Sequence, residues 1–565
     1  MKEWTLMFYF AGDNDVAPVM VSELKAIKNA GFHEDVDVLI HFDPNEPGAR
    51  TRIFDVNRER KRETRNKIGD NRDSFVHNMR DDVIEPKEVG TAVGRRGRFF
   101  GEELNKPDST NAEDSLTDFL DFCLSKHRAK RYMLFLVGHG MVVGNDAFLP
   151  DEHPLSAITL KGLGEILKSF SASLKKPQET FELLALHSCS MIALEVAYEL
   201  KGTAKFMIAS EGPSFVGSWP YRQLLIKIFN NLEDTKRNVR RRLKGRGIDQ
   251  NKAAKNPDID ITKLIEDLYH HTFFNAADFL LAGHPLDLAL CSLDPGKIDG
   301  VARSLQGLVA ILIESLKASS RKDDSPATRL GKRIKELVLL AHLEAQSYWG
   351  ESYTDLFDFC RCLGERCGSN DDLKDLHKAC SDVMKKLKLE KSERVVIRSR
   401  NFGSKSQYSH GLSIFFPWSR PIEDVSNGEP IENVRKAGRG AKIQGEEKNS
   451  VEKKGVLERY KEYAFTDEVK ENTWLDFLET YFDKTQRPSR EQEDGKRVLL
   501  RQEGVTVSEG FRPLGLSSML NKVGPRLDKV GAQQGADCTC ASIKNYPQIS
   551  EEKKPRKGKA GKGKA

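Results

Sequence analysis

The sequence predicts an α/β fold in which a mainly parallel sheet is flanked by helices. Short and nearly continuous apolar runs are typical of strands that are buried on both faces, and they lie at 4–10, 36–42, 132–137, 181–186 and 205–209. Patterns with helical periodicity lie between these runs, at 19–30, 115–125, 160–174 and 191–200. An alternation of strands and helices predicts parallel pairing, with helices on both faces of the sheet.

The composition is that of a globular protein with room for a large core. The chain has 565 residues, of which 38% are hydrophobic and 31% charged. Its net charge of +6 is small for this length, and the basic residues are clustered, so composition alone does not indicate a nucleic-acid-binding protein. The nine cysteines are scattered and odd in number, which argues against a disulfide framework. No stretch approaches the roughly 18 apolar residues of a membrane helix. The first apolar run lacks a signal-peptide cleavage site, and we expect a reduced, cytoplasmic protein.

The first part of the chain, residues 1–230, contains this alternation. It also contains a long polar insertion at about 48–114, for which we expect limited structure. A basic linker is predicted at 231–258, within which residues 236–246 carry seven basic side chains and no acidic one. This pattern is typical of a solvated linker or a helix face. The functional alternative is a protease-sensitive joint or a patch that docks anions.

A second and more helical region is predicted at 259–482, followed by a tail at 483–565. The helical patterns lie at 264–281, 298–319, 327–343 and 474–482, and one more buried strand is predicted at 410–418. The tail has few apolar residues and ends in "EEKKPRKGKAGKGKA", which predicts that it is largely disordered. No second pair of suitable spacing accompanies Cys538 and Cys540, so we expect no zinc site.

Two motifs with catalytic residue types follow neighbouring strands. His139 lies between two glycines in "VGHG", and Cys189 lies in "LHSCSM" just before a helical pattern. Functional sites of parallel sheets form beyond the carboxyl ends of the strands, and N–H groups at the start of a helix favour a thiolate. A buried apolar Cys and a structural His are the simpler alternatives. The occurrence of both residues at strand ends favours a nucleophile and base pair.

The chain resembles the clostripain family of cysteine peptidases, which shares a caspase-like fold. The resemblance rests on "WTLMFYFAGDND" (4–15), "FLVGHG" (135–140) and "LHSCSMIALEVAYELKGTAKFMIASEGPSFVGSWPY" (186–221). Downstream, "SYTDLFDF" (352–359), "HGLSIFFP" (410–417) and "TWLDFLETYF" (473–482) also resemble family segments. The resemblance therefore extends to about residue 482.

The resemblance implies a cysteine endopeptidase that acts through a thioester intermediate. Cys189 would be the nucleophile and His139 the group that accepts and donates the proton. The backbone N–H groups of Gly140 and Cys189 would form the oxyanion hole. The residues expected to line the substrate pocket are Asp15, His187, Ser210, Glu211, Gly217 and Trp219. The alternative is a caspase-like scaffold or binding protein without catalytic activity.

Two positions depart from the family pattern. Relatives usually carry Asp at the positions of His187 and Gly217, and these acids make them prefer Arg or Lys before the scissile bond. A guanidinium buried without a carboxylate costs several kcal/mol, so basic specificity is not expected unless Glu211 replaces them. His187 has three interpretations: it lines the altered pocket, it is a structural hydrogen bonder, or it is the base in place of His139.

Relatives often mature by self-cleavage between the His and Cys strands. Here this region is 141–179, with 149–163 as the expected loop, while 236–246 is a second candidate for self-cleavage or for an upstream protease. We expect no cofactor. Some relatives need calcium, but no loop has closely alternating acidic ligands. The expected partners are a protein or peptide substrate and an activating protease, with no membrane, and nucleic acid only non-specifically through the basic linker or tail. A regulated intracellular protease fits these features, and a role in bacterial defence would be one such case.

Overall fold

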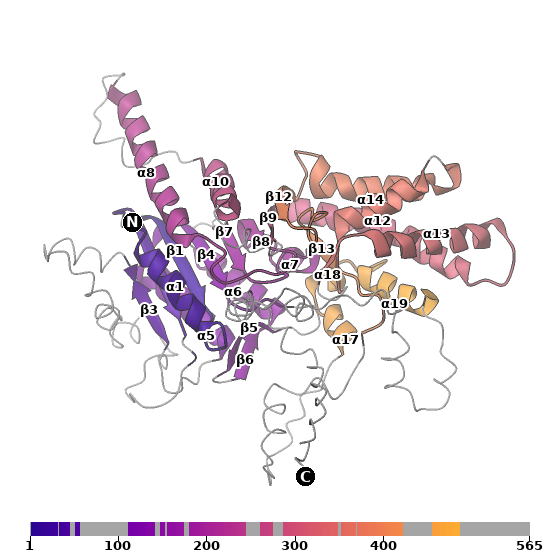
Figure 1. The fold of residues 1–565 in the computed structure, drawn as a ribbon, viewed down its shortest axis with the longest axis horizontal. Coiled ribbons are helices and arrows are strands. Elements are labelled where there is room, and N and C mark those ends of the chain that lie inside the picture. The colour runs from indigo at the N-terminus through magenta and orange to yellow at the C-terminus, as the bar shows by residue number, and fades with distance from the viewer. Residues whose placement is uncertain are drawn as a thin grey trace, which may run out of the picture.

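The fold is that of a computed structural model (Figure 1). It describes residues 2–31, 33–43, 45, 51–56, 111–141, 147–152, 155–174, 180–244, 260–274, 286–348, 352–368, 370–421 and 455–485. Three predicted features fall largely outside the described residues. They are the tail at 483–565 except residues 483–485, the pair Cys538 and Cys540, and most of the insertion at 48–114.

The centre of the molecule is an eight-stranded sheet with the order β12-β9-β8-β7-β4-β1-β2-β3. The strands are β1 (Lys2–Phe10), β2 (Val36–Phe42), β3 (Arg52–Asp55), β4 (Ala129–Val137), β7 (Phe181–His187), β8 (Ala204–Ala209), β9 (Leu286–Ser292) and β12 (Val396–Phe402). The five predicted strands form the parallel centre, and β3, β9 and β12 pair antiparallel. The predicted fold class, a mainly parallel sheet flanked by helices, is confirmed.

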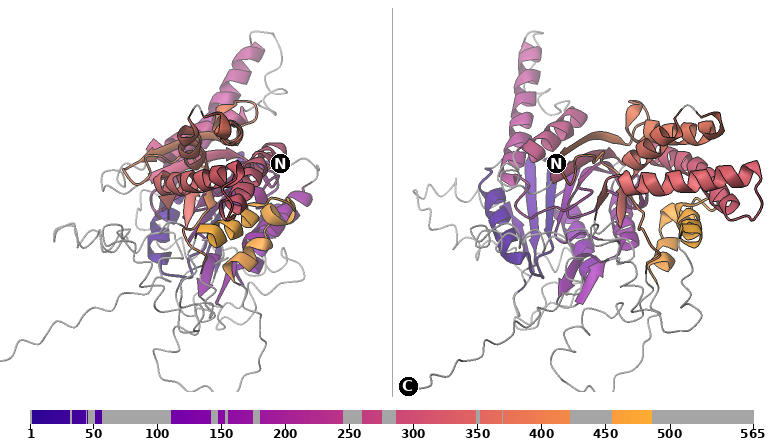
Figure 2. Two further views of the ribbon diagram at one scale, coloured as in Figure 1. Left: turned by 90° about the vertical axis from the view of Figure 1, so that its right-hand side faces the viewer. Right: turned by 45° about the vertical axis from the view of Figure 1, so that its right-hand side comes forward.

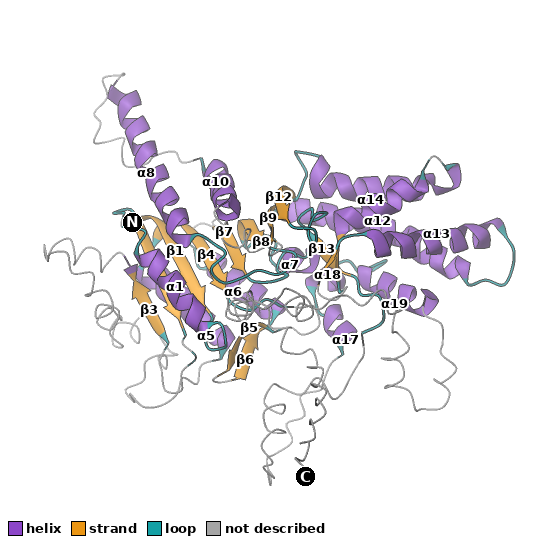
Figure 3. Cartoon of the chain, viewed as in Figure 1, coloured by secondary structure: helices purple, strands orange, loops and turns teal. Residues whose placement is uncertain are grey.

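Both faces of the sheet are buried, because helices cover each one (Figure 3). In β1, Trp4, Leu6 and Phe8 belong to one core, while Met7 and Tyr9 belong to the other, as the alternation of side chains along a strand requires. The first core includes α1 (Ala17–Lys28), α8 (Tyr221–Lys244) and α10 (Ile261–Phe274). The second includes α5 (Ala112–Lys126), α6 (Leu160–Ala172) and α7 (Leu194–Glu199).

The C-terminal region adds a helical layer that continues the second core. Its helices are α12 (Pro295–Ser319), α13 (Pro326–Glu344), α14 (Leu356–Cys367), α15 (Lys374–Met384), α17 (Val456–Lys461), α18 (Ala464–Asp467) and α19 (Trp474–Thr485), with a 3₁₀ turn at Asp371–Leu373 and a π-helical turn at Lys385–Leu389. A small sheet of β10 (Ser347–Tyr348), β11 (Tyr353–Asp355) and β13 (Ser413–Phe415) lies among them. The strand predicted at 410–418 is thus confirmed as the shorter β13. Because β9 and β12 belong to the central sheet, this region shares the sheet with the first part of the chain.

Three predicted segments differ in the structure. Residues 231–244, predicted as linker, are the second half of α8, which projects beyond the sheet (Figure 2). Within it, Lys236 is buried and contacts the carboxylates of Asp35 and Glu34. The expected loop at 149–163 is wrong, because β5 (Phe148–Glu152), β6 (Leu155–Ile158) and the first turn of α6 occupy it. β3 lies inside the predicted insertion, where it pairs with β2.

Within the described part of the chain, no helix has the length and apolar character needed to cross a membrane. The same residues contain no group of three or more His, Cys, Asp or Glu side chains that could hold a metal ion.

Candidate active site

The two predicted catalytic residues follow equivalent positions of neighbouring parallel strands. Val137 at the end of β4 pairs in register with His187 at the end of β7, so His139 and Cys189 each lie two residues beyond the same pair. The backbones then touch: a Cβ added at Gly140 would lie 1.9 Å from the carbonyl oxygen of Cys189 and 2.6 Å from its nitrogen. Only glycine fits at that position. The structure therefore brings the "GHG" and "HSC" motifs together.

His139 is held through one ring nitrogen. Its Nε2 lies 2.7 Å from Oδ1 of Asp15, and the residue is 4% exposed. Its Nδ1 is buried and has no hydrogen-bond partner among the described residues. Asp15, predicted to line the substrate pocket, thus contacts the predicted base.

The turn after β1 positions Asp15. The N–H of Ala11 donates to the carbonyl of Val137, which keeps this chain segment beside β4. The Asn14 side chain donates to the carbonyls of Ala11 (3.0 Å) and Pro150 (2.9 Å), and its oxygen accepts from the N–H of Val16 (3.2 Å). Asn side chains commonly stabilise such turns by bonding nearby backbone groups. The "GDND" motif therefore presents a carboxylate to His139 from the next strand.

Cys189 is completely buried in this conformation. Its Sγ accepts from the N–H of Ser214 (3.2 Å), and its thiol donates to the Ser214 carbonyl (3.4 Å). The predicted helix start at 191 is wrong: α7 begins at Leu194, because residues up to Ala193 pair with the segment around Ser413. Stabilisation of the thiolate by a helix start directly after Cys189 therefore does not apply.

The backbone beside Cys189 is strained. Ser190 has a φ of +57°, in the left-handed region that non-glycine residues rarely adopt. Such conformations cost about 1–3 kcal/mol and are common at functional sites. The amides of Gly140 and Cys189 lie at the same end of the sheet, because their backbones touch. Their role as an oxyanion hole remains a prediction.

His187 uses both ring nitrogens in a buried network. Its Nδ1 lies 2.6 Å from the hydroxyl of Tyr221, and its Nε2 lies 2.7 Å from the Phe215 carbonyl and 3.2 Å from the Ser218 hydroxyl. Its ring stacks on Trp219 with centroids 4.6 Å apart. Burial lowers the pKa of His187 to about 3, so the ring is neutral and donates from Nε2 to the carbonyl. The structure thus favours the structural interpretation of His187 and leaves neither nitrogen for a base.

The remaining predicted pocket residues take different places. Trp219 is buried beneath His187, and the Ser210 hydroxyl donates to the Asp287 carbonyl in β9. Gly217 has a φ of +89°, which suits a residue without Cβ. The loop 210–218, which contains Ser210 and Gly217, also supplies the Ser214 contacts to Cys189, which sequence reasoning missed.

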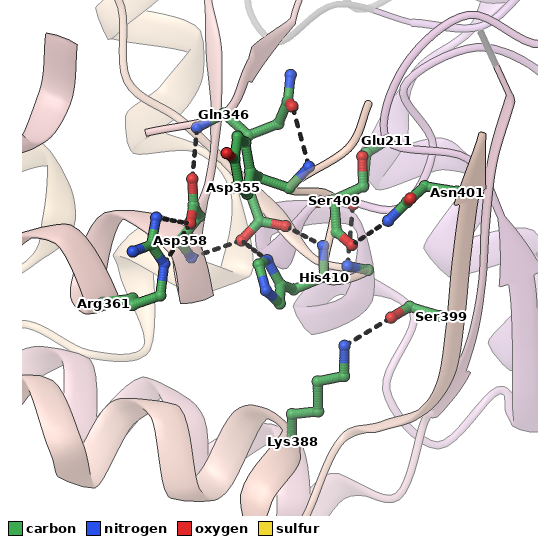
Figure 4. Close-up of polar contacts among 12 residues, drawn as sticks. Glu211, Gln346, Asp355, Asp358, Arg361, Lys388, Ser399, Asn401, Ser409 and His410 are labelled. Atoms are coloured by element: carbon green, nitrogen blue, oxygen red, sulfur yellow. Dashed lines mark hydrogen bonds and ion pairs between the residues drawn. The ribbon is translucent and has the colours of Figure 1, made fainter. Parts of the chain in front are cut away.

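Glu211 belongs to a buried cluster of carboxyl groups, which we call the carboxylate cluster: Glu211, Asp287 and Asp355. Figure 4 labels Glu211 and Asp355 of this cluster. Glu211 Oε2 accepts from the N–H of Gly411 (2.9 Å) and the hydroxyl of Tyr348 (3.3 Å). Asp287 accepts from the N–H groups of Glu211 and Gly212. The predicted pocket carboxylate is therefore bound by the C-terminal region.

The pKa values of two carboxyl groups in the carboxylate cluster, those of Glu211 and Asp287, are raised. Burial, with the charges of Asp355 and Asp287, raises the pKa of Glu211 well above its usual range, and Glu211 lies within hydrogen-bonding reach of Asp355. Burial raises the pKa of Asp287 to about 6. The Lys388 Nζ donates to the hydroxyl of Ser399 (Figure 4); burial lowers the pKa of Lys388, and the charges of Asp355 and Glu211 oppose this shift. Asp355 lies in the "SYTDLFDF" segment, but nothing in its sequence spacing indicated a contact with Glu211.

Comparison with known proteins identifies the family. A model of the clostripain family matches residues 8–480. The chain is similar to the X-ray structure of a secreted C11 cysteine protease from Bacteroides thetaiotaomicron in complex with an irreversible peptide inhibitor (13% identity, 78% of this chain and 99% of that one, TM-score 0.41). It is also similar to an inactive zymogen C11 protease from Parabacteroides distasonis (16%, 74% and 93%, TM-score 0.40). No curated protein matches it. Because the family model covers most of its length, the chain belongs to the clostripain family and is a cysteine peptidase.

Proposed function

We propose that this peptidase is an endopeptidase that uses Cys189 as nucleophile and His139 as the group that carries the proton. The observation that carries this proposal is the register of β4 and β7, which places both residues two positions beyond the same strand pair. The backbone contact between Gly140 and Cys189 supports it, because the two motifs lie side by side.

In this mechanism the Cys189 thiol gives its proton to the His139 ring, and Sγ forms a bond to the carbonyl carbon of the peptide. The amides of Gly140 and Cys189 donate to the oxygen that takes up the negative charge. The C–N bond then breaks, the imidazolium gives its proton to the leaving nitrogen, and a thioester remains. Water attacks the thioester and gives a proton to the ring, which returns it to the departing thiolate.

We also propose that the described conformation is a precursor. A substrate carbonyl cannot reach Cys189 while its side chain is fully buried under the loop 210–218. One similar protein is described as an inactive zymogen. Cleavage by the peptidase itself or by an upstream protease would release this loop, and mass spectrometry of the activated protein would identify the cut bond.

The proposed specificity is for a neutral or acidic residue before the scissile bond. His187 is neutral and committed to Phe215 and Tyr221, and Gly217 has no side chain. Within the carboxylate cluster, burial and the neighbouring charges of Asp355 and Asp287 raise the pKa of Glu211 well above its usual range, which favours its uncharged form. A guanidinium therefore meets no ionised carboxylate from these three positions. Cleavage of a peptide library by the activated protein tests this, and a strong preference for Arg or Lys would contradict it.

The function itself is tested with a thiol-directed acyloxymethyl ketone probe, before and after limited proteolysis. The wild type is expected to become labelled on activation, and the Cys189→Ala protein to stay unlabelled. The alternative, a non-catalytic scaffold, is favoured by the burial of Cys189. It would be supported if the wild type stayed unlabelled after proteolysis and cleaved no library peptide.

We propose a reduced, intracellular setting for this enzyme. The seven cysteines in the described part of the chain are all buried and form no disulfide. Two of them, Cys360 and Cys380, are a pair of thiols within hydrogen-bonding reach of each other. Such pairs remain thiols most readily in a reducing compartment. Cell fractionation tests the location, and recovery of the protein outside the cell would overturn it.

Contact with nucleic acid through the basic segments is expected to be non-specific and to weaken as salt increases.

A further inference from the structure

We propose that Asp15 is a positioning residue for His139: it holds the ring through Nε2 and leaves Nδ1 as the nitrogen that exchanges the proton with Cys189. This inference rests on the proposed function of Cys189 and His139. It adds a third member to the pair, from a third strand end of the sheet, where the sequence analysis placed a pocket residue.

The first argument is the identity of the donor and acceptor. Nε2 of His139 lies 2.7 Å from Asp15 Oδ1. An ionised carboxylate only accepts hydrogen bonds, so the proton of the neutral ring must be on Nε2. The lone pair is then on Nδ1, which is buried and has no hydrogen-bond partner among the described residues. The contact therefore selects one tautomer and one working nitrogen.

The second argument is the rigidity of the support on both sides of the contact. Asn14 bonds the carbonyls of Ala11 and Pro150, and the Asp13 carbonyl accepts from the N–H of Glu152. On the other side, the His139 carbonyl accepts from the N–H of Leu149. The turn with the carboxylate and the loop with the imidazole are thus both fastened to β5. A residue that orients a catalytic ring needs such second contacts.

The third argument is charge. His139 must become an imidazolium when Cys189 ionises, and its side chain is only 5% exposed, so water stabilises that charge poorly. Asp15 offers a negative charge in direct contact, while its own side chain is 41% exposed and needs little desolvation. The carboxylate therefore favours the charged pair of catalytic groups over the neutral one.

The test compares the activated wild type with Asp15→Asn and Asp15→Glu. Asp15→Asn is expected to lower kcat about 10- to 100-fold, less than the 10²–10⁴ that general acid–base catalysis supplies, and to change KM less than about threefold. Because the imidazolium loses its counter-charge, the alkaline limb of the kcat/KM profile is expected to move to lower pH. Asp15→Glu keeps the charge and should recover part of kcat and restore the alkaline limb.

A matched control is Glu233→Gln. Glu233 Oε1 lies 3.0 Å from Nε2 of His33, which is the same kind of contact on α8, away from Cys189. This variant should retain the kcat and pH profile of the wild type. The spectroscopic readout is the ¹⁵N chemical shifts of His139 in the Cys189→Ala protein. The Nε2–H tautomer is expected there, and a mixture once Asp15→Asn is added.

The outcomes separate the two proposals. If Cys189→Ala abolishes activity but Asp15→Asn keeps the kcat, the pH profile and the tautomer of its parent, the inference about Asp15 is wrong and the proposed function stands. If Asp15→Asn, Asp15→Glu and Glu233→Gln lose activity equally, together with folded protein, the role of Asp15 is structural and the inference falls. An activated wild type without labelling or cleavage overturns the proposed function, and the inference with it.

Discussion

Two histidines lie next to Cys189 at the ends of neighbouring strands, and their surroundings are opposite. His139 after β4 has one nitrogen on the partly exposed carboxylate of Asp15 and a second nitrogen without a partner in the described structure. His187 at the end of β7 has both nitrogens in hydrogen bonds and is fully buried. The hydrogen-bond partners of an imidazole, and not its distance along the chain from Cys189, decide whether it can carry protons.

Replacement of His139 by Ala should give the largest effect on activity. We expect kcat/KM to fall about 10²–10⁴-fold, because the proton carrier is lost. The unfolding midpoint should change little, because the His139 side chain makes a single hydrogen bond among those described. Kinetics of the activated protein and thermal unfolding measure the two effects, and retention of activity would make His139 dispensable.

Replacement of His187 by Ala should act through stability instead. The Tyr221 hydroxyl and the Phe215 carbonyl would remain buried without this partner, and a cavity would form where the His187 ring stacks on Trp219. We expect a loss of about 3–5 kcal/mol in the free energy of unfolding. Urea unfolding measures it. A normal stability combined with loss of kcat would reverse the comparison between the two histidines.

The pH dependence of stability distinguishes His187 from the carboxylate cluster. The pKa of His187 is lowered to about 3 in the folded protein, so the unfolded chain binds more protons between about 3 and 6.5, and this group adds stability as pH rises through that range. The pKa of Glu211 is raised, so the folded state binds more protons above about 4.5, and this group removes stability as pH rises.

Glu211→Gln therefore should be more stable than the wild type at pH 8 and similar to it near pH 4.5. Between the pKa of Glu211 in the unfolded chain and its raised pKa in the folded protein, only the folded protein holds this proton. In that range the gain in the free energy of unfolding should grow by about 1.4 kcal/mol for each pH unit. Urea unfolding at several pH values checks this. A gain that does not change with pH would mean that Glu211 is ionised in the folded state.

Replacement of Gly217 by Asp sharpens the comparison with the family pattern. The φ of +89° makes any side chain there strained, at a cost of about 1–2 kcal/mol. We expect the library profile to shift about tenfold toward Arg or Lys, which is worth about 1.4 kcal/mol. Gly217→Asn has the same shape without charge and should shift nothing, so an equal shift in both variants would reject the electrostatic explanation.

The smallest effect is expected from Ser190→Gly. Glycine adopts the φ of +57° without strain, so the variant should be more stable by about 1 kcal/mol. If the strain helps to orient Cys189, kcat should fall a few-fold while thermal stability rises. A destabilised variant would show that the Ser190 side chain contributes more than its backbone strain costs.

The sequence predicted those features that depend on a single helix or strand, or on the order of neighbouring strands. The apolar runs predicted the central strands, and the parallel order of β4 and β7 was enough to place His139 beside Cys189. Predictions from the sequence were wrong where segments that are distant along the chain contact each other. The helix after Cys189 begins only at Leu194, because Ala193, the residue before it, pairs with Ser413.

Side-chain roles were less predictable than side-chain places. Asp15 was expected in the substrate pocket, but it contacts His139. The turn that Asn14 stabilises directs Asp15 to this place, and a turn of this kind leaves no periodic pattern in the sequence. Glu211 was expected near the substrate, but groups 137 and 200 residues further along the chain bind its carboxyl. Contacts between residues so far apart leave no local pattern in the sequence.

The contact of Glu211 with Gly411 also has a consequence during synthesis. The loop 210–218, in which Ser214 contacts Cys189, is anchored by Tyr348 and Gly411, and the sheet beside it is completed by β9 and β12. A ribosome that has made His139 and Cys189 has therefore not yet made the residues that anchor this loop. The described position of the loop 210–218 thus depends on residues that are synthesised about two hundred positions later, so this part of the molecule completes its fold late in synthesis.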